Sequence, residues 1–513
     1  MSLPSYASTA LATTLLLALP AGAGDFHVDA QQGSDLTGDG SAAAPWQTLS
    51  HALGQLAAAG PAGADVLHVA AGVHDPALGE SFPLAIPSGV TVRGSGTGAT
   101  VIGGAPGLVL FEALAGPAGG PGPVLLEDLT LSQAAVGLRV QPGGGGPGAA
   151  RVRRLAVLDA TAEGIAVEGD GSGLAFHAEL VYFGDCAKGL AADYPAGPGN
   201  LVTAVNSTFE DCAVGLELVA RTGPPGPGDP AGASLERVSF RSCSTGLRVE
   251  AQGPAVASAE LTSCLLSGGQ IGVAAEGDAE VVLANCTVSG NGVGLETAGP
   301  AAALARFRLH STIVWGNSTS NLDPASVALS TFSDTDPLLP GVGNLSVDPA
   351  FANAQAGDYH LALGSPLIDL GDPLEPPGGL DRDVDPRVLD GDGDGLAWRD
   401  VGWDEHNVTR LSPSGPALLG TIVTMTTEAP PGTQYCLGIA VEAVDFPVGG
   451  LGSFLINPFG MIVLGCAAVP GTDTLAISSS PAVIGFTFYL QSTAFTQGGV
   501  GSTSNRVTLV LQP

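Results

Sequence analysis

A short motif recurs along the middle of the chain: a glycine, an apolar residue directly after it, and a further apolar or small residue two positions later. Successive glycines are separated by 22 to 31 residues. They are Gly137, Gly164, Gly189, Gly215, Gly246, Gly272 and Gly294. A near-constant period with insertions of variable length is typical of a solenoid, in which each repeat packs only on its neighbours.

Apolar residues recur at every second position around each glycine, which is the periodicity of a β-strand. The residues directly after the glycines are Leu138, Ile165, Leu190, Leu216, Leu247, Val273 and Leu295. The residues six positions before them are Leu131, Leu158, Phe183, Phe209, Phe240, Leu266 and Val288. Stretches such as GGGGPG and TGPPGPGDP lie between these runs and indicate loops. We therefore predict a parallel β-helix; a leucine-rich repeat would need an LxxLxL consensus and a helical segment in each unit.

Five of the seven cysteines fall in two columns of this repeat, three and eight residues before the glycine. They are Cys186, Cys212 and Cys243 in the first column and Cys264 and Cys286 in the second. We interpret them as small, polarizable core residues stacked on one another, and no histidine shares the stack to make a metal site. Neighbouring coils also bring Cys264 and Cys286 close enough for a disulfide, and Cys436 with Cys466 is a second candidate pair.

The chain carries a net charge of −32, from 49 acidic and 17 basic residues. Such a surface repels nucleic acid and anionic lipid, and it also repels a polyanionic sugar unless cations intervene, so we expect no nucleic-acid partner. Residues 1–23 contain the apolar run ALATTLLLALP followed by Ala-Gly-Ala, which predicts a secretory signal peptide and a secreted or cell-surface protein. No later apolar run has the length of a transmembrane segment, and export permits disulfides.

The stretch FHVDAQQGSDLTGDGSAAAPWQTLSHAL, residues 26–53, predicts a strand, a Gly/Asp-rich turn and a short helix with Leu49, Leu53 and Leu56 on one face. With the following GESFPLAIPSGVTVRG, it resembles the opening of secreted bacterial proteins of the pectate-lyase-like right-handed parallel β-helix superfamily. The segment 348–373, with GDYHLALGSPLID, resembles the closing segment of the same superfamily. The resemblance implies that the helix caps the open end of the solenoid; it does not specify a reaction.

Beyond about residue 410, alternating apolar and polar segments separated by Pro/Gly turns predict a small antiparallel β-sandwich. The predicted fold is thus all-β, a right-handed parallel β-helix with an N-terminal helical cap followed by this sandwich. The predicted organisation is a signal peptide at 1–23, the β-helix at 24–345, its closing segment with an Asp-rich loop at 346–408, and the sandwich at 409–513.

The sequence DGDGDG places Asp390, Asp392 and Asp394 at alternate positions of a Gly-rich turn, as in the first half of a calcium loop. The twelfth position of such a loop is Val401, and Asp400 lies one residue short. Calcium bound by these four aspartates is one interpretation. The alternative is a solvated turn whose aspartates bond to their own backbone.

Positions four and five before the glycines hold Asp159, Asp185, Glu210, Asp211 and Arg241 on four consecutive predicted coils. Paired carboxylates could hydrolyse a glycosidic bond, or hold Ca²⁺ while an arginine abstracts a proton. The alternative is a solvated acidic edge. The Gly-His-Gly and Arg-x-Lys motifs of polygalacturonases are absent, the histidines are dispersed, and aromatic residues are scarce on the coils. We therefore assign no catalytic residue and favour an exported, non-catalytic protein for display, adhesion or polysaccharide binding over a lyase or hydrolase.

Overall fold

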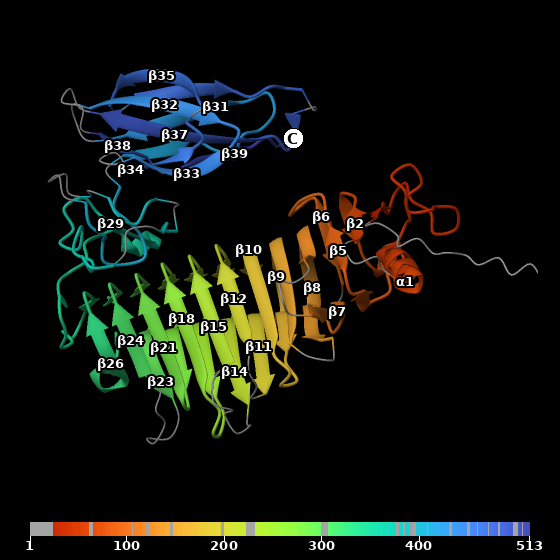
Figure 1. Cartoon of the computed structure of the whole chain (residues 1–513), viewed down its shortest axis with the longest axis horizontal. Helices are drawn as coiled ribbons and strands as arrows, with labels where there is room; N and C mark the ends of the chain where they lie inside the picture. The colour runs from red at the N-terminus through yellow and green to blue at the C-terminus, as the bar shows by residue number, and fades with distance from the viewer. Residues whose placement is uncertain are drawn as a thin grey trace, which may run out of the picture.

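The computed structural model describes most of the chain after the predicted signal peptide, which itself lies outside the described residues. The described ranges are 24–60, 65–104, 106–117, 124–143, 147–195, 200–221, 231–298, 306–375, 379–382, 385–389, 391, 397–407, 409–429, 433–448, 452–458, 460–469, 471–480, 483–495, 501–504 and 506–512. The chain is nearly all β, and its main body is a right-handed parallel β-helix of about eight turns (Figure 1). The predicted fold class is confirmed.

Each coil contributes strands to three parallel ladders, which we call faces A, B and C. Face A follows the repeated glycine and holds β4 (Leu84–Ile86), β7 (Val109–Pro117), β11 (Lys188–Pro195), β14 (Val214–Arg221), β17 (Thr245–Ala251), β20 (Ile271–Glu276) and β23 (Val293–Ala298). Face B holds β1 (Asp25–Val28), β2 (Asp65–Val69), β5 (Val90–Arg93), β12 (Leu201–Val205), β15 (Ala231–Glu236), β18 (Ala257–Thr262), β21 (Ala279–Ala284), β24 (Arg306–His310) and β26 (Val327–Thr331).

Face C is the narrowest, because most of its strands have only two to four residues. It holds β3 (Gly72–His74), β6 (Thr100–Gly103), β13 (Thr208–Glu210), β16 (Ser239–Arg241), β19 (Leu265–Ser267), β22 (Thr287–Ser289), β25 (Ile313–Trp315) and β27 (Asp334–Thr335). Three strands run through the corners and belong to two or three faces: β8 (Val124–Pro142), β9 (Gly148–Glu168) and β10 (Leu174–Gly184).

Left-handed residues form the two corners that flank face C. One column, between faces C and A, is Gln133, Asp159, Asp185, Asp211, Ser242, Gly268, Gly290 and Gly316, all with positive φ. The other, between faces B and C, is Asp128, Arg154, Leu180, Asn206, Arg237, Ser263, Asn285, Ser311 and Phe332. Glycine, aspartate and asparagine tolerate this conformation best, which accounts for much of the composition of the first column.

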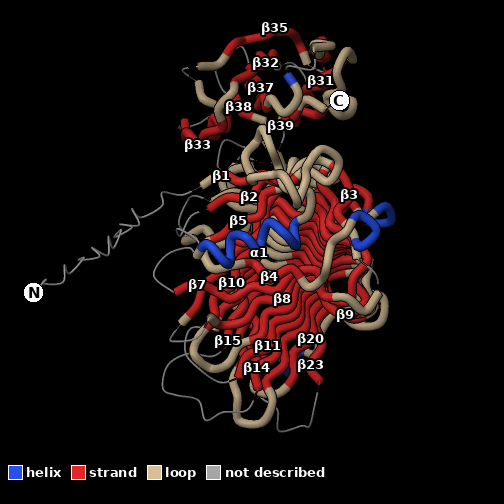
Figure 2. The backbone as a smooth tube through the Cα atoms, turned by 90° about the vertical axis from the view of Figure 1, so that its right-hand side faces the viewer, coloured by secondary structure: helices blue, strands red, loops and turns tan. Residues whose placement is uncertain are grey.

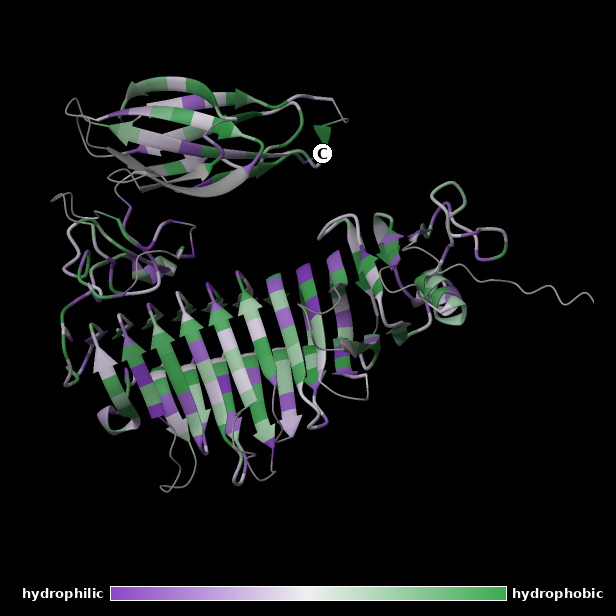
Figure 3. Cartoon of the chain, viewed as in Figure 1, coloured by the Kyte–Doolittle hydropathy of each residue, from purple (hydrophilic) through white to green (hydrophobic). Residues whose placement is uncertain are grey.

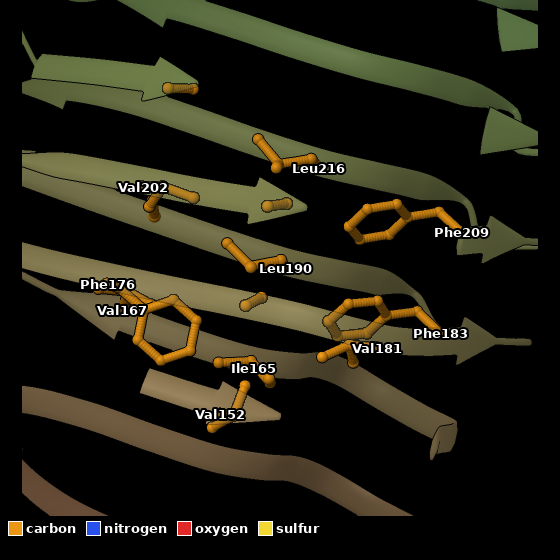
Figure 4. Packing of buried hydrophobic residues seen from close by; sticks show 14 of the residues in the cluster. Val152, Ile165, Val167, Phe176, Val181, Phe183, Leu190, Val202, Phe209 and Leu216 are labelled. Carbon is orange, nitrogen blue, oxygen red and sulfur yellow. The ribbon is translucent and has the colours of Figure 1, made fainter. Parts of the chain in front are cut away.

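The interior is built from stacked like residues, as predicted. In face A, Leu138, Ile165, Leu190 and Leu216 are paired in register, and each is fully buried. In face C, the rings of Phe183, Phe209 and Phe240 stack with centroids 4.5 and 4.8 Å apart. Figure 4 shows the rings of Phe183 and Phe209. Repeated glycines are required beside this stack, because a Cβ on Gly215 would lie 2.5 Å from the Phe240 ring.

One coil departs from the predicted alignment. Val157, not Leu158, pairs with Leu131 and Phe183, because the ladder between β8 and β9 shifts register between Ala134 and Val136. The extra residue lies between the corner and Gly164, so counting back from that glycine displaces the column by one position. Asp159 consequently aligns with Asp185 and Asp211 rather than with Glu210.

The cysteines of the solenoid are all buried free thiols. Their interpretation as buried core residues is confirmed, and the candidate Cys264–Cys286 disulfide is not formed. The Cys264 thiol instead forms hydrogen bonds with the carbonyls of Leu235 and Thr262. The other candidate pair, Cys436 and Cys466, does form a disulfide between neighbouring strands of the C-terminal sheet.

The predicted cap is α1 (Leu49–Ala59), which lies across the first coils (Figure 2). Leu49, Ala52, Leu53 and Leu56 form its buried face, which joins the core of the solenoid. The Thr48 side chain accepts a hydrogen bond from the His51 N–H and so starts the helix. The helix shields the first unpaired coil from water and from edge-to-edge association.

The chain then forms a closing segment and a β-sandwich (Figure 1). The closing segment contains the antiparallel pair β28 (Phe351–Asn353) and β29 (Asp358–Leu361). The sandwich contains β30 (Arg410–Pro413), β31 (Ile422–Glu428) and β36 (Gly471–Ala476) in one sheet, and β35 (Ile462–Ala468), β32 (Gln434–Ala440), β37 (Thr487–Phe495), β38 (Gly501–Thr503) and β39 (Val507–Val510) in the other, with the hairpin β33 (Ala443–Val448) and β34 (Gly452–Ile456). Short 3₁₀ helices are η1 (Pro76–Leu78), η2 (Pro324–Ser326) and η3 (Ala354–Ala356).

Hydrophobic and hydrophilic residues alternate along many strands of the solenoid (Figure 3). Within the described ranges, no helix combines the length and the hydrophobicity that a membrane crossing requires.

Candidate functional site

The predicted acidic cluster lies at the corner between faces C and A. Asp159, Asp185 and Asp211 are left-handed corner residues on three consecutive coils, and all three are exposed. Glu210 and Arg241 are in register on neighbouring strands of face C, and Arg241 is exposed. The structure therefore brings the five residues to one region. The three aspartates are explained by their backbone conformation.

A tyrosine that the sequence analysis did not single out belongs to the same region. Tyr182, on β10, is 38% exposed and donates a hydrogen bond of 2.8 Å from its hydroxyl to Glu210. Burial and this hydrogen bond raise the pKa of Tyr182 to about 12. The phenol is therefore held protonated at neutral pH, which disfavours it as a general base.

Most of the predicted calcium loop lies outside the described residues: Asp390, Asp392 and Asp394 are among the residues that the structure does not describe. Asp400 is described and fully buried, and its two carboxylate oxygens accept hydrogen bonds from the Asp369 and His406 N–H groups. Burial raises the pKa of Asp400 to about 7. Asp369 accepts from the Gly391 and Trp398 N–H groups, so it joins the two ends of the loop.

Asp400 therefore holds two parts of the closing-segment backbone together by hydrogen bonds. Among the described residues, no group of three or more Asp, Glu, His or Cys side chains is arranged to hold a metal ion. Calcium at the DGDGDG loop stays a prediction.

The closing segment also buries an ion pair. Arg387 and Glu405 are 2% and 1% exposed, with 3.1 Å between Nη1 and Oε1, and the same guanidinium donates to the Gly402 carbonyl. The Gly402 N–H donates to the Ser311 carbonyl on the β-helix. Burial raises the pKa of Glu405, and the charge of Arg387 opposes that rise. The pair therefore fixes the strip of backbone that packs on the last coils.

Face A carries charges that neutralise one another. Glu217 and Arg248 are in register, with 4.0 Å between Oε1 and Nε. Lys188 approaches Glu217 to 2.5 Å, and Arg248 also pairs with Glu250 and Glu276 at 3.0 and 3.3 Å. Such cross-strand ion pairs support the register of the coils and leave little charge for a ligand.

Face B contains a cavity of about 220 Å³ that the sequence analysis missed. Its polar lining is Arg151 on β9, His177 on β10 and Thr203 on β12, and its apolar lining includes Ala149, Ala175 and Leu201. The sequence does contain a signal: Arg151, His177 and Thr203 are 26 residues apart, the commonest coil length, and so fall at one outward position on successive coils. A cavity of this size suits one sugar ring or one charged group, since pockets for larger ligands reach roughly 300–1,000 Å³.

The comparisons with known proteins agree with this architecture. The sequence model of a family described as "Protein of unknown function (DUF1565)" matches residues 31–131, which comprise the cap and the first coils. By fold, this chain is a parallel β-helix protein. No curated protein sequence matches the chain.

Two solved structures illustrate the similarity. The mannuronan C-5 epimerase AlgE4 A-module of Azotobacter vinelandii is 14% identical, with a TM-score of 0.29, over 58% of this chain and 92% of that one. The tailspike protein 3 of bacteriophage CBA120 is 12% identical, with a TM-score of 0.35, over 61% of this chain and 59% of that one.

Proposed function

We propose that this chain is an exported, non-catalytic protein that binds polysaccharide on the outer surface of its β-helix. The observation that carries the proposal is the cavity on face B, which has room for about one sugar ring and is lined by an arginine, a histidine and a threonine. A polymer lying along the coils would meet similar side chains at regular intervals, because parallel coils repeat about every 4.8 Å. The predicted signal peptide supports export.

The alternative, a lyase or hydrolase that uses the acidic cluster, has less support. Glycoside hydrolysis needs two carboxyl groups that flank one scissile bond. The exposed corner positions of Asp159, Asp185 and Asp211 are instead explained by their left-handed backbone conformation. The Glu210 carboxylate already accepts a hydrogen bond from the Tyr182 hydroxyl.

The test is affinity electrophoresis of the full mature chain in gels that contain soluble polysaccharides, together with assays for reducing ends and unsaturated products. We expect retardation by at least one polysaccharide and no product, with the same behaviour for Asp211→Ala. Product formation that Asp211→Ala abolishes would establish the hydrolase or lyase instead. Absence of retardation by every polysaccharide would contradict binding.

A further inference from the structure

Arg151 is a positive group without a carboxylate partner among the described residues. The neighbouring Arg153 and Arg154 each pair with the buried Glu127, at 3.3 and 3.2 Å. Arg151 forms no such ion pair, and its Nε is buried without an acceptor in the described part of the chain. A guanidinium in this state offers charge-assisted, planar hydrogen bonds to an anionic group of a ligand.

His177 complements the guanidinium with an acceptor. The hydroxyl of Thr203 donates to the Phe176 carbonyl at 3.2 Å, so it accepts from His177 Nδ1, which is 2.6 Å away. This arrangement assigns the proton to Nδ1 and leaves the lone pair of the neutral ring on Nε2. Burial lowers the pKa of His177, so the ring is neutral at pH 7. The cavity thus pairs strong donors from Arg151 with one acceptor from His177.

We infer that this cavity binds a sugar acid, with the carboxylate at Arg151 and a neighbouring hydroxyl donating to His177 Nε2. The inference rests on the proposed function and specifies its ligand. A carboxylate alone would leave the imidazole acceptor unused, and a neutral sugar would offer the guanidinium only uncharged hydroxyl acceptors, which form weaker hydrogen bonds with it than a carboxylate does. A hydroxy acid satisfies both groups at once.

The charge of the protein limits how many acidic residues the ligand carries. The net charge is −32, and Glu179 lies at the next outward position of β10, in register with Arg153. A densely charged polyuronate would be repelled by this field, whereas one acidic residue in an otherwise neutral glycan meets a local positive group. The ligand is therefore a neutral glycan with isolated or terminal sugar acids.

Isothermal titration of the full mature chain tests this inference. The probes are pairs of tetrasaccharides of xylose, glucose and galactose, each either neutral or ending in one uronic acid, together with tetragalacturonate. In at least one pair, we expect the acidic member to bind ten- to a hundredfold more tightly than the neutral one. Tetragalacturonate should bind more weakly than that acidic member at low salt and gain affinity as salt is added.

Arg151→Gln should remove the preference for the acidic member, and His177→Phe should weaken both members of the pair. The matched control is Arg308→Gln on β24 of the same face, whose arginine is paired with Glu280 and which should bind as the wild type does. Melting curves establish that each variant is folded. Equal binding of neutral and acidic members overturns the sugar-acid assignment but leaves polysaccharide binding standing. A preference that survives Arg151→Gln in a folded protein overturns the site. If no tetrasaccharide and no polysaccharide binds, the proposed function fails with it.

Discussion

Two regions of face B use the same hydrogen bond in opposite electrostatic surroundings. In the middle of the face, on β9, β10 and β12, which we call the open region, His177 Nδ1 forms a hydrogen bond with Thr203 on the next coil. At the covered end, made by β21, β24 and β26, His310 Nδ1 forms a hydrogen bond with Thr331 on the next coil, at 2.9 Å. Burial lowers the pKa of His177, whereas a hydrogen bond to the Glu375 carboxylate of the closing segment raises that of His310.

The difference comes from the chain that packs on the coils. The closing segment places Glu375 and Asp372 at 3.5 and 3.7 Å from His310 Nε2 and encloses them with Arg399, which lies 3.2 Å from Glu375. No described residue forms an ion pair with Arg151 or His177 in the open region. The covered end of the face is thus completed by the protein's own carboxylates, and the open region presents an arginine and a histidine to a ligand.

The largest expected effect follows from removing the buried ion pair of the closing segment, which packs on the covered end. Arg387→Ala leaves Glu405 buried without its ion-pair partner, and we expect it to destabilise the closing segment by about 3–5 kcal/mol. Urea denaturation followed by Trp403 fluorescence measures this, because the Trp403 side chain is buried in the closing segment against Leu265 of the β-helix. Sugar binding in the open region should not change.

The control for this prediction is the double variant Arg387→Met and Glu405→Met. Removing both charges together avoids the unpaired buried carboxylate, so its loss of stability should be clearly smaller. Equal losses in the single and double variants would show that packing, and not charge, holds the segment on the coils.

A smaller effect tests the charge of the covered end. Because the pKa of His310 is raised, the stability that it contributes is complete below its ordinary pKa of 6.5 and is lost as pH rises through the raised value. Burial raises the pKa of Glu375, but its hydrogen bond with His310 and the charge of Arg399 outweigh this, and the net shift is downward. Glu375→Gln should therefore remove about 0.5–1 kcal/mol of stability near pH 6 and much less at pH 8.5, since both groups are partly exposed. Melting temperatures across this range, with the His310 titration followed by NMR, check the expectation; a loss that is independent of pH would contradict it.

The positions of the buried residues inside the β-helix were predictable from the sequence. The roles of the outward residues were predictable only in part. Leu138, Ile165 and Leu190 repeat because each coil buries the same position, so their register could be counted from the glycines. The alignment predicted for Asp159 was wrong, because its coil contains one extra residue before the glycine and a fixed distance from the glycine does not allow for it.

Outward residues need not be hydrophobic, so their sequence pattern does not show which of them could bind a ligand. The acidic column attracted attention because its residues are charged, although backbone conformation accounts for three of them. Arg151 and His177 were missed although their spacing equals the coil length. What distinguishes Arg151 from Arg153 and Arg154 is that no described carboxylate pairs with it, and this depends on the conformations of side chains on several coils.

The smallest effect tests the open region directly. Because burial lowers the pKa of His177, the neutral ring is favoured in the folded state, and its contribution to stability is complete above pH 6.5 and is lost as pH falls below that value. Replacing His177 by Gln should therefore reduce the acid sensitivity of the protein by less than about 1 kcal/mol, since the ring is partly exposed and screened by solvent. The sign is opposite to that of the Glu375 variant, so melting temperatures of both variants between pH 5 and 8 separate the open region from the covered end. A His177 resonance that titrates above pH 6.5 in NMR would mean that a carboxylate, such as Glu179, controls the ring in the open region too, and the contrast between the two regions would be lost.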